Sequence, residues 1–135
     1  MKIYCTEDFY RDYKTLVRKN SYKGLAKLLF DFLTKNNEDS LKSKATCLNT
    51  GAKHPNIKYY LGGKKKYRLY YLVVNSDTIL YIVYPKFGAK GKANLKGSTR
   101  EAMNLSEKAM ILFDDKQNIF EITFIEKDII FEPVV

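Results

Sequence analysis

The chain has little cysteine, histidine and proline, and it has no tryptophan. Its 135 residues include two Cys, one His, three Pro and no Trp. Cys5 and Cys47 form no Cys-x-x-Cys pair, so we expect reduced thiols rather than a disulfide framework or a thiolate metal site. His54 precedes Pro55 in a polar stretch, which favours an exposed loop histidine over a histidine-based metal or acid–base site. The sequence therefore predicts no metal and no cofactor.

Long apolar runs are also missing. No stretch approaches the ~20 apolar residues that a membrane-spanning helix needs. The start of the chain turns acidic at Glu7 and Asp8, too early for a secretory signal. These absences predict a cytoplasmic protein with no membrane partner.

The composition is that of a folded globular domain. The chain is 45% hydrophobic and 29% charged, which is too apolar for a disordered chain. Its length suits one domain and can bury a core without a disulfide or metal staple.

The positive charge is concentrated in the middle of the chain. The formal net charge is +9, which suggests a polyanionic partner. Residues 1–50 carry net +4, residues 51–100 carry eleven basic residues and one acidic residue, and residues 101–135 carry net −5. The middle segment has only Asp77 as a carboxylate, so it cannot hold the cations of a two-metal nuclease or phosphatase. Any phosphate chemistry there must use Lys and Arg.

Two helices are predicted first. Thr6 is a good N-cap, with Glu7 and Asp8 in the first turn, and apolar residues follow at helical spacing up to Val17. A second helix can start at Ser21 and shows an apolar stripe through Phe32. We expect the two to form an antiparallel hairpin, and residues 36–52 to form a loop.

Strands are predicted next. Residues 57–61, 68–74 and 79–84 are rich in β-branched and aromatic residues and are separated by turn signals, which predicts an antiparallel meander. The two later runs are apolar on both faces, so both faces should be covered, one of them by the helix pair. Either Ser98 or Thr99 then caps a helix running to Met110, and residues 118–125 and 129–131 predict two more strands. The fold class is α+β.

Basic and aromatic side chains alternate along the meander. Lysines and one arginine surround its strands, and tyrosines lie between them; these residues are Lys58, Tyr59, Tyr60, Lys64, Lys65, Lys66, Tyr67, Arg68, Tyr70, Tyr71, Tyr81, Tyr84, Lys86, Lys90, Lys92 and Lys96. Lys and Arg contact phosphates and Tyr stacks on unpaired bases, which favours single-stranded RNA. Alternation places Arg68 and Tyr70 on one face and Tyr71 on the other, core-facing side. There are plainer alternatives to RNA binding: Lys64–Lys66 can be a solubilising turn, and the tyrosines can simply pack within the strands.

The order of these motifs resembles the RelE/ParE superfamily of bacterial type II toxin–antitoxin toxins, most closely its HigB-like members. The resemblance rests on the helix hairpin, the strand Tyr-Arg-Leu-Tyr-Tyr at 67–71, the strand Ile-Leu-Tyr to Tyr-Pro-Lys at 79–86, and Lys-Gly-Lys at 90–92. It covers roughly residues 3–105. It implies a helix hairpin packed on a small antiparallel sheet, and a metal-independent endoribonuclease that cleaves mRNA, in some members on the ribosome, and is neutralised by a cognate antitoxin protein.

The resemblance also implies a set of site residues. By position, Arg68 binds the phosphate and stabilises the transition state, Lys58 is a general base or phosphate contact, and Lys86 supports the scissile phosphate. Tyr84 is the candidate general acid, because the usual position of that group reads Asn94 and Leu95 here. Lys64, Lys65, Lys66, Tyr70, Lys90 and Lys92 are expected to bind RNA.

Two features fall outside the resemblance. The acidic end of the chain, residues 106–135, is an extension that we expect to pack on the toxin-like domain of residues 1–105. One hypothesis places this segment against the basic surface as a regulator of RNA binding. The lack of a clear general acid leaves open a catalytically silent module of the same fold that binds nucleic acid or an acidic protein. A gyrase-poisoning toxin is a weaker third alternative.

Overall fold

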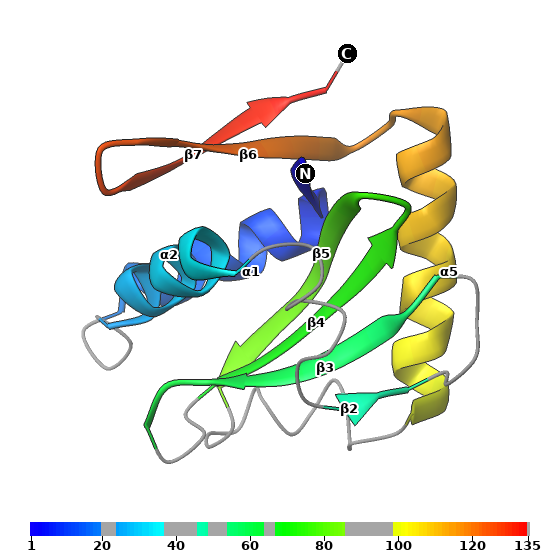
Figure 1. Ribbon diagram of the computed structural model, residues 1–135, viewed down its shortest axis with the longest axis horizontal. Helices are drawn as coiled ribbons and strands as arrows, with labels where there is room; N and C mark the ends of the chain where they lie inside the picture. Colours follow the sequence, from blue (N-terminus) through cyan, green and yellow to red (C-terminus); the bar gives the residue numbers. More distant parts are fainter. Residues whose placement is uncertain (20–23, 37–45, 49–53, 64–66, 86–98, 135) are drawn as a thin grey trace.

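The computed structural model describes residues 1–19, 24–36, 46–48, 54–63, 67–85 and 99–134 of the chain. Its helices and strands pack as three layers, with the sheet in the middle (Figure 1). In chain order the elements are β1 (Ile3–Thr6), α1 (Glu7–Val17), α2 (Leu25–Lys35), β2 (Thr46–Cys47), β3 (Asn56–Leu61), β4 (Tyr67–Val74), β5 (Asp77–Pro85), α5 (Thr99–Asp115), β6 (Ile119–Ile125) and β7 (Asp128–Pro133). None of the described helices is both long enough and apolar enough to cross a membrane.

The strands of the described part form one mixed sheet. Their order across the sheet is β2-β3-β4-β5-β1-β6-β7. The pair β1 and β5 is parallel, and the other neighbouring pairs are antiparallel. The predicted meander is therefore confirmed as β3-β4-β5. Asn75 takes a positive φ of 56° in the tight turn between β4 and β5, a conformation that asparagine tolerates well.

Helices α1 and α2 cover one face of the sheet, as expected. The side chain of Thr6 accepts a hydrogen bond from the backbone N–H of Phe9 at 3.2 Å, so Thr6 is the N-cap of α1. The apolar stripes of both helices pack on β4 residues of that face, such as Leu69 and Tyr71, and most of these side chains are buried. Burial of this apolar surface is the main source of stability for the face.

Helix α5 covers the opposite face. Its buried side includes the small residues Ala102, Ser106 and Ala109, which let the helix lie close to the sheet. Figure 1 shows α5 in yellow on one side of the β3-β4-β5 strands and α1 and α2 on the other. The prediction that both faces of β4 and β5 are covered is thereby confirmed.

The C-terminal strands extend the main sheet. Strand β6 pairs with β1, from Ile3 opposite Ile122 to Thr6 opposite Ile119, and β7 forms the outer edge. Phe120 stacks on Tyr10 of α1 with ring centroids 4.6 Å apart, and Phe131 meets the same ring edge to face at 4.9 Å. The boundary expected from the sequence, between residues 105 and 106, lies in the middle of α5.

Sequence reasoning missed one short strand. Residues 36–52 were expected to be a loop, but Thr46 and Cys47 pair with Lys58 and Ile57 as β2. A strand of two residues has too few side chains to show a period, so only its partner reveals it. The expected start of the second helix at Ser21 lies outside the described residues.

Candidate functional site

The candidate site lies on the face of the sheet that also carries α5. The register places Tyr60 directly opposite Arg68, and Arg68 directly opposite Tyr84. One row further along the same strands, Lys58 lies opposite Tyr70. Directly opposed residues of neighbouring strands point to the same side. Three residues selected from the sequence as catalytic, Lys58, Arg68 and Tyr84, are therefore brought together on one face.

Arg68 is the centre of this group. Its Nη1 donates a hydrogen bond to the hydroxyl oxygen of Tyr84 at 3.0 Å. Its Cζ lies 5.6 Å from the ring centroid of Tyr60 and 5.7 Å from that of Tyr84, distances at which a cation is attracted to an aromatic ring. The hydrogen bond with Tyr84 raises the pKa of Arg68 further, and partial burial opposes this only in part. The guanidinium is thus a fixed positive charge.

Lys58 completes the basic side of the group. Its Nζ lies 5.3 Å from the ring centroid of Tyr60, so that ring stands between two cations. Lys58, Tyr60 and Arg68 are each half-buried. No carboxylate of the described ranges forms an ion pair with Lys58 or Arg68, since the pairs found there are Arg11 with Asp8 and Lys35 with Asp31. We call Lys58, Tyr60, Arg68 and Tyr84 the Arg68 cluster.

Arg68 keeps unused hydrogen-bonding capacity. Its Nε is buried, and it has no hydrogen-bond partner among the described residues. A buried donor without a partner costs free energy, and a ligand acceptor reaches this one only after the side chains that cover it move. A guanidinium held by Tyr84 on one nitrogen and unsatisfied on another is suited to an anion with several oxygens, such as a phosphate.

A bulge in β5 makes this arrangement possible. Tyr70 pairs with Ile82 but Tyr71 pairs with Leu80, so Tyr81 is an extra residue on β5. The insertion changes which side the following residues face. As a result Tyr84 lies on the Arg68 side, while Val83 belongs to the core under α1 and α2.

Tyr70 requires a correction. Alternation placed it correctly on the Arg68 face, but its side chain is only 2% exposed, so it is not available to stack on an RNA base. Its ring packs 6.3 Å from the rings of both Tyr81 and Tyr84. Burial, followed by a hydrogen bond with the Tyr84 hydroxyl, raises the pKa of Tyr70. The face of the sheet that α5 covers is itself part of the core. Tyr70 is therefore a buried residue that packs against Tyr84 and supports it.

Tyr60 is the residue of the cluster that the sequence did not select for the site. Tyr59 packs on Phe32 of α2 at 4.6 Å between ring centroids, so Tyr60 must face the other way. The spacing Lys58-x-Tyr60 within a strand could have shown this, since alternate residues share a face. The remaining predicted residues, namely Lys64, Lys65, Lys66, Lys86, Lys90 and Lys92, lie outside the described residues.

The described ranges bring no three His, Cys, Asp or Glu side chains close enough together to hold a metal ion. Burial raises the pKa of the Cys5 thiol, which keeps it in the unreactive, protonated form.

Comparison with known proteins finds no relative of this chain. No family model matches the chain, and neither a curated protein nor a solved structure matches it.

Proposed function

We propose that this protein is a metal-independent endoribonuclease that cleaves mRNA, a toxin of the RelE-like type whose cognate antitoxin protein covers the basic surface. The observation that carries the proposal is the Arg68 cluster, in which a strand lysine, a strand arginine and a tyrosine hydroxyl meet on one face. The order of β1, two helices and the β3-β4-β5 meander supports the RelE-like arrangement that the sequence resembles.

The reaction we propose is an internal displacement at phosphorus. The ribose 2′-oxygen attacks the adjacent phosphate and loses its proton to a base, for which Lys58 is the candidate. The bond between phosphorus and the 5′-oxygen breaks, and that oxygen takes a proton from an acid, for which Tyr84 is the candidate. The charge that develops on the phosphate oxygens is stabilised by Arg68. The products are a 2′,3′-cyclic phosphate and a 5′-hydroxyl end.

The position of Arg68 suits this role. Its guanidinium is held by Tyr84 and by two aromatic rings, so little freedom is lost when it binds a phosphate. Hydrogen bonds from a guanidinium to phosphate are charge-assisted and often two-pronged, which makes them strong and directional.

A second function is favoured by one observation. The Tyr84 side chain is 7% exposed, and its hydroxyl is engaged by both Arg68 and Tyr70. A hydroxyl held in this way is poorly placed to protonate a leaving group unless the substrate displaces a partner. The alternative is a module that binds RNA or an acidic protein through the same cluster without cleaving it.

Inducible expression in bacteria tests the proposal. Wild type should arrest growth and produce cleaved mRNA, and Arg68→Ala should do neither. Arg18→Ala is the matched control, because it removes an exposed arginine at the end of α1, outside the cluster. Growth arrest without mRNA cleavage would favour the binding module, and the absence of both in wild type would reject the toxin.

A further inference from the structure

Strand β5 is paired along only part of one edge. On the side away from β4, β1 pairs with Thr78, Ile79 and Leu80 and ends at Thr6, where the chain turns into α1. Residues 82–85 of β5 pair with β4 on their other side, and Tyr81 is the bulge residue, but no strand of the described ranges pairs with residues 81–85 on this side. Figure 1 shows α1, rather than a strand, beside this half of β5. Among the described residues, the strand position in line with β1 is thus unfilled.

This position is an open groove. A cavity of about 420 Å³ runs along Tyr81–Tyr84, and an adjoining cavity of about 140 Å³ continues along Val83–Pro85. Five strand residues span roughly 16 Å, which matches a peptide of the same length. We call this groove, together with the edge of residues 81–85, the β5 slot.

The two walls of the β5 slot differ in chemistry. On the α1 side most of the described lining residues are polar or charged and include Asp8, Arg11 and Asp12, with Leu16 as an apolar member. On the α5 side the lining residue is Leu105, which is 38% exposed and lies one turn from Lys108. Successive side chains of a strand point to opposite faces. A strand lying in the slot would therefore direct one set of side chains to polar groups and the other set to Leu105.

We propose that the β5 slot binds a short extended peptide segment of a partner protein, which adds a strand to the sheet beside β5. Main-chain hydrogen bonds to the β5 edge supply affinity, and the two walls select the sequence. The segment has apolar residues on the side facing α5 and polar residues on the side facing α1. The slot shares Tyr84 with the Arg68 cluster, but a strand in the slot pairs with the main chain of β5, so the proposal does not depend on RNA cleavage.

A peptide fits the slot better than a second copy of this chain. The slot is flanked by α1 on one side and α5 on the other, so it admits a single strand but not the edge of a sheet covered by its own helices. Two copies would also bring together two chains of net charge +9, and this repulsion opposes their association.

Peptide titration followed by NMR tests the proposal. The probe is an acetylated and amidated pentapeptide, Val-Lys-Val-Gln-Val, added to the full-length isotope-labelled protein. Its counterpart with proline at the centre is the control, because proline cannot donate to a ladder and disfavours pairing. We expect the first peptide to shift the amide signals of residues 81–84 and to slow their hydrogen exchange by about tenfold, and the proline peptide to do neither.

Two variants of α5 test whether peptide binding depends on the slot or on any exposed apolar residue of that helix. Leu105→Glu should weaken binding about tenfold, since it replaces the apolar wall with a charge. Ile111→Glu places the same charge on the same helix at a residue that is 62% exposed and does not line the described slot, so binding should change less than about twofold. Both positions are exposed, and thermal unfolding confirms that both variants fold.

Three results would overturn the proposal: no shifts at residues 81–84, equal binding of the proline peptide, or equal weakening by both variants. A concentration-dependent dimer that protects the same amides without peptide would also overturn it, in favour of a second copy in the slot.

Discussion

Arg68 Nη1 donates a hydrogen bond of 3.0 Å to the hydroxyl of Tyr84, the residue directly opposite it on the neighbouring strand. The bond joins the candidate phosphate-binding group to the candidate general acid. Tyr84→Phe removes the hydroxyl and keeps the ring. If Tyr84 donates the proton, RNA cleavage should fall about 100-fold or more, while RNA affinity, measured by fluorescence anisotropy, should change less than about threefold.

Tyr81→Phe is the matched control for that experiment. It removes a hydroxyl from the same strand, but that hydroxyl bonds to Asn56 rather than to Arg68. Cleavage by Tyr81→Phe should stay close to wild type. Equal losses in both variants would contradict a special role for Tyr84.

Replacing Arg68 by lysine tests the importance of the guanidinium shape. Arg68→Lys keeps one positive charge but loses the planar fork and the geometry of the bond to Tyr84. We expect cleavage to fall at least about tenfold, while the dependence of RNA affinity on salt stays unchanged because the number of cations is the same. Full activity of the lysine variant would show that charge alone is sufficient.

Much of this site could be predicted from the sequence, and the reasons for the rest are specific. The β-branched and aromatic runs located β4 and β5, and alternation placed Arg68 on its correct face. The position of Tyr84 depends on the extra residue Tyr81 in β5, and the sequence of that strand gives no sign of a bulge. The burial of Tyr70 depends on α5, which returns to the sheet from far along the chain.

Local sequence patterns also could not predict which strands pair when they lie far apart along the chain. Strand β1 lies between β5 and β6, and each of these pairings joins segments more than seventy residues apart. The charge pattern of the last 35 residues suggested an added segment, whereas the pairing of β6 with β1 makes it part of the sheet.

Accordingly, a chain cut after residue 105 should fail to fold, and circular dichroism would show the loss of cooperative unfolding.

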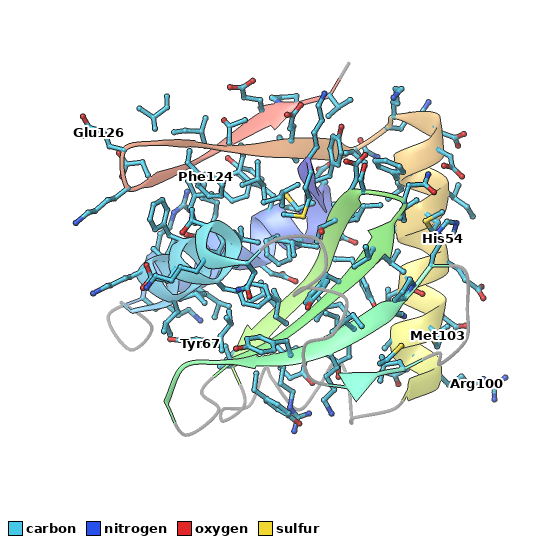
Figure 2. The ribbon with its side chains drawn as sticks, viewed as in Figure 1. His54, Tyr67, Arg100, Met103, Phe124 and Glu126 are labelled. Atoms are coloured by element: carbon cyan, nitrogen blue, oxygen red, sulfur yellow. The ribbon has the colours of Figure 1, made fainter. Side chains whose placement is uncertain are left out.

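The buried pair of Tyr81 and Asn56 should stabilise the contact between α5 and the sheet. The Tyr81 hydroxyl donates to Asn56 Oδ1, and Asn56 Nδ2 lies 3.1 Å from Met103 Sδ on α5. Figure 2 shows Met103 on the part of α5 near the start of β3. Asn56→Ala should lower the free energy of unfolding by about 1–3 kcal/mol, because a buried hydroxyl loses its acceptor.

A double-mutant cycle measures this pair directly. Combining Asn56→Ala with Tyr81→Phe should cost less than the sum of the single changes by at least about 0.5 kcal/mol in urea unfolding. Strict additivity would show that the two side chains act independently.

The acidic side chains of the β6–β7 turn should not affect RNA binding. Strand β6 is three strand positions from β4, which carries Arg68, or roughly 14 Å at the usual spacing, which exceeds the ~8 Å screening length at physiological salt. Figure 2 shows Glu126 at this turn, projecting away from the strand that carries Tyr67. Glu126→Gln combined with Asp128→Asn should leave RNA affinity within about twofold of wild type. A marked rise in affinity would support the hypothesis that this segment regulates RNA binding.

Stability should fall in alkaline solution through the buried tyrosines. Burial raises the pKa of Tyr13 from 10.0 to about 12. Between about pH 10 and 12 the unfolded chain releases this proton while the folded chain keeps it, so the free energy of unfolding decreases over that range and is unaffected below it. Tyr13→Phe should reduce the decrease by on the order of 2 kcal/mol. An unchanged pH profile in this variant would assign the effect to other groups.

The chemistry of the cleaved RNA ends tests the central claim most directly. Purified protein is added to a reconstituted translation reaction, and the ends of the cleaved mRNA are mapped for wild type and Arg68→Ala. The proposed mechanism predicts 2′,3′-cyclic phosphate and 5′-hydroxyl ends with wild type and no cleavage with a folded Arg68→Ala. Intact mRNA with wild type, 5′-phosphate ends, or equal cleavage by Arg68→Ala would contradict it.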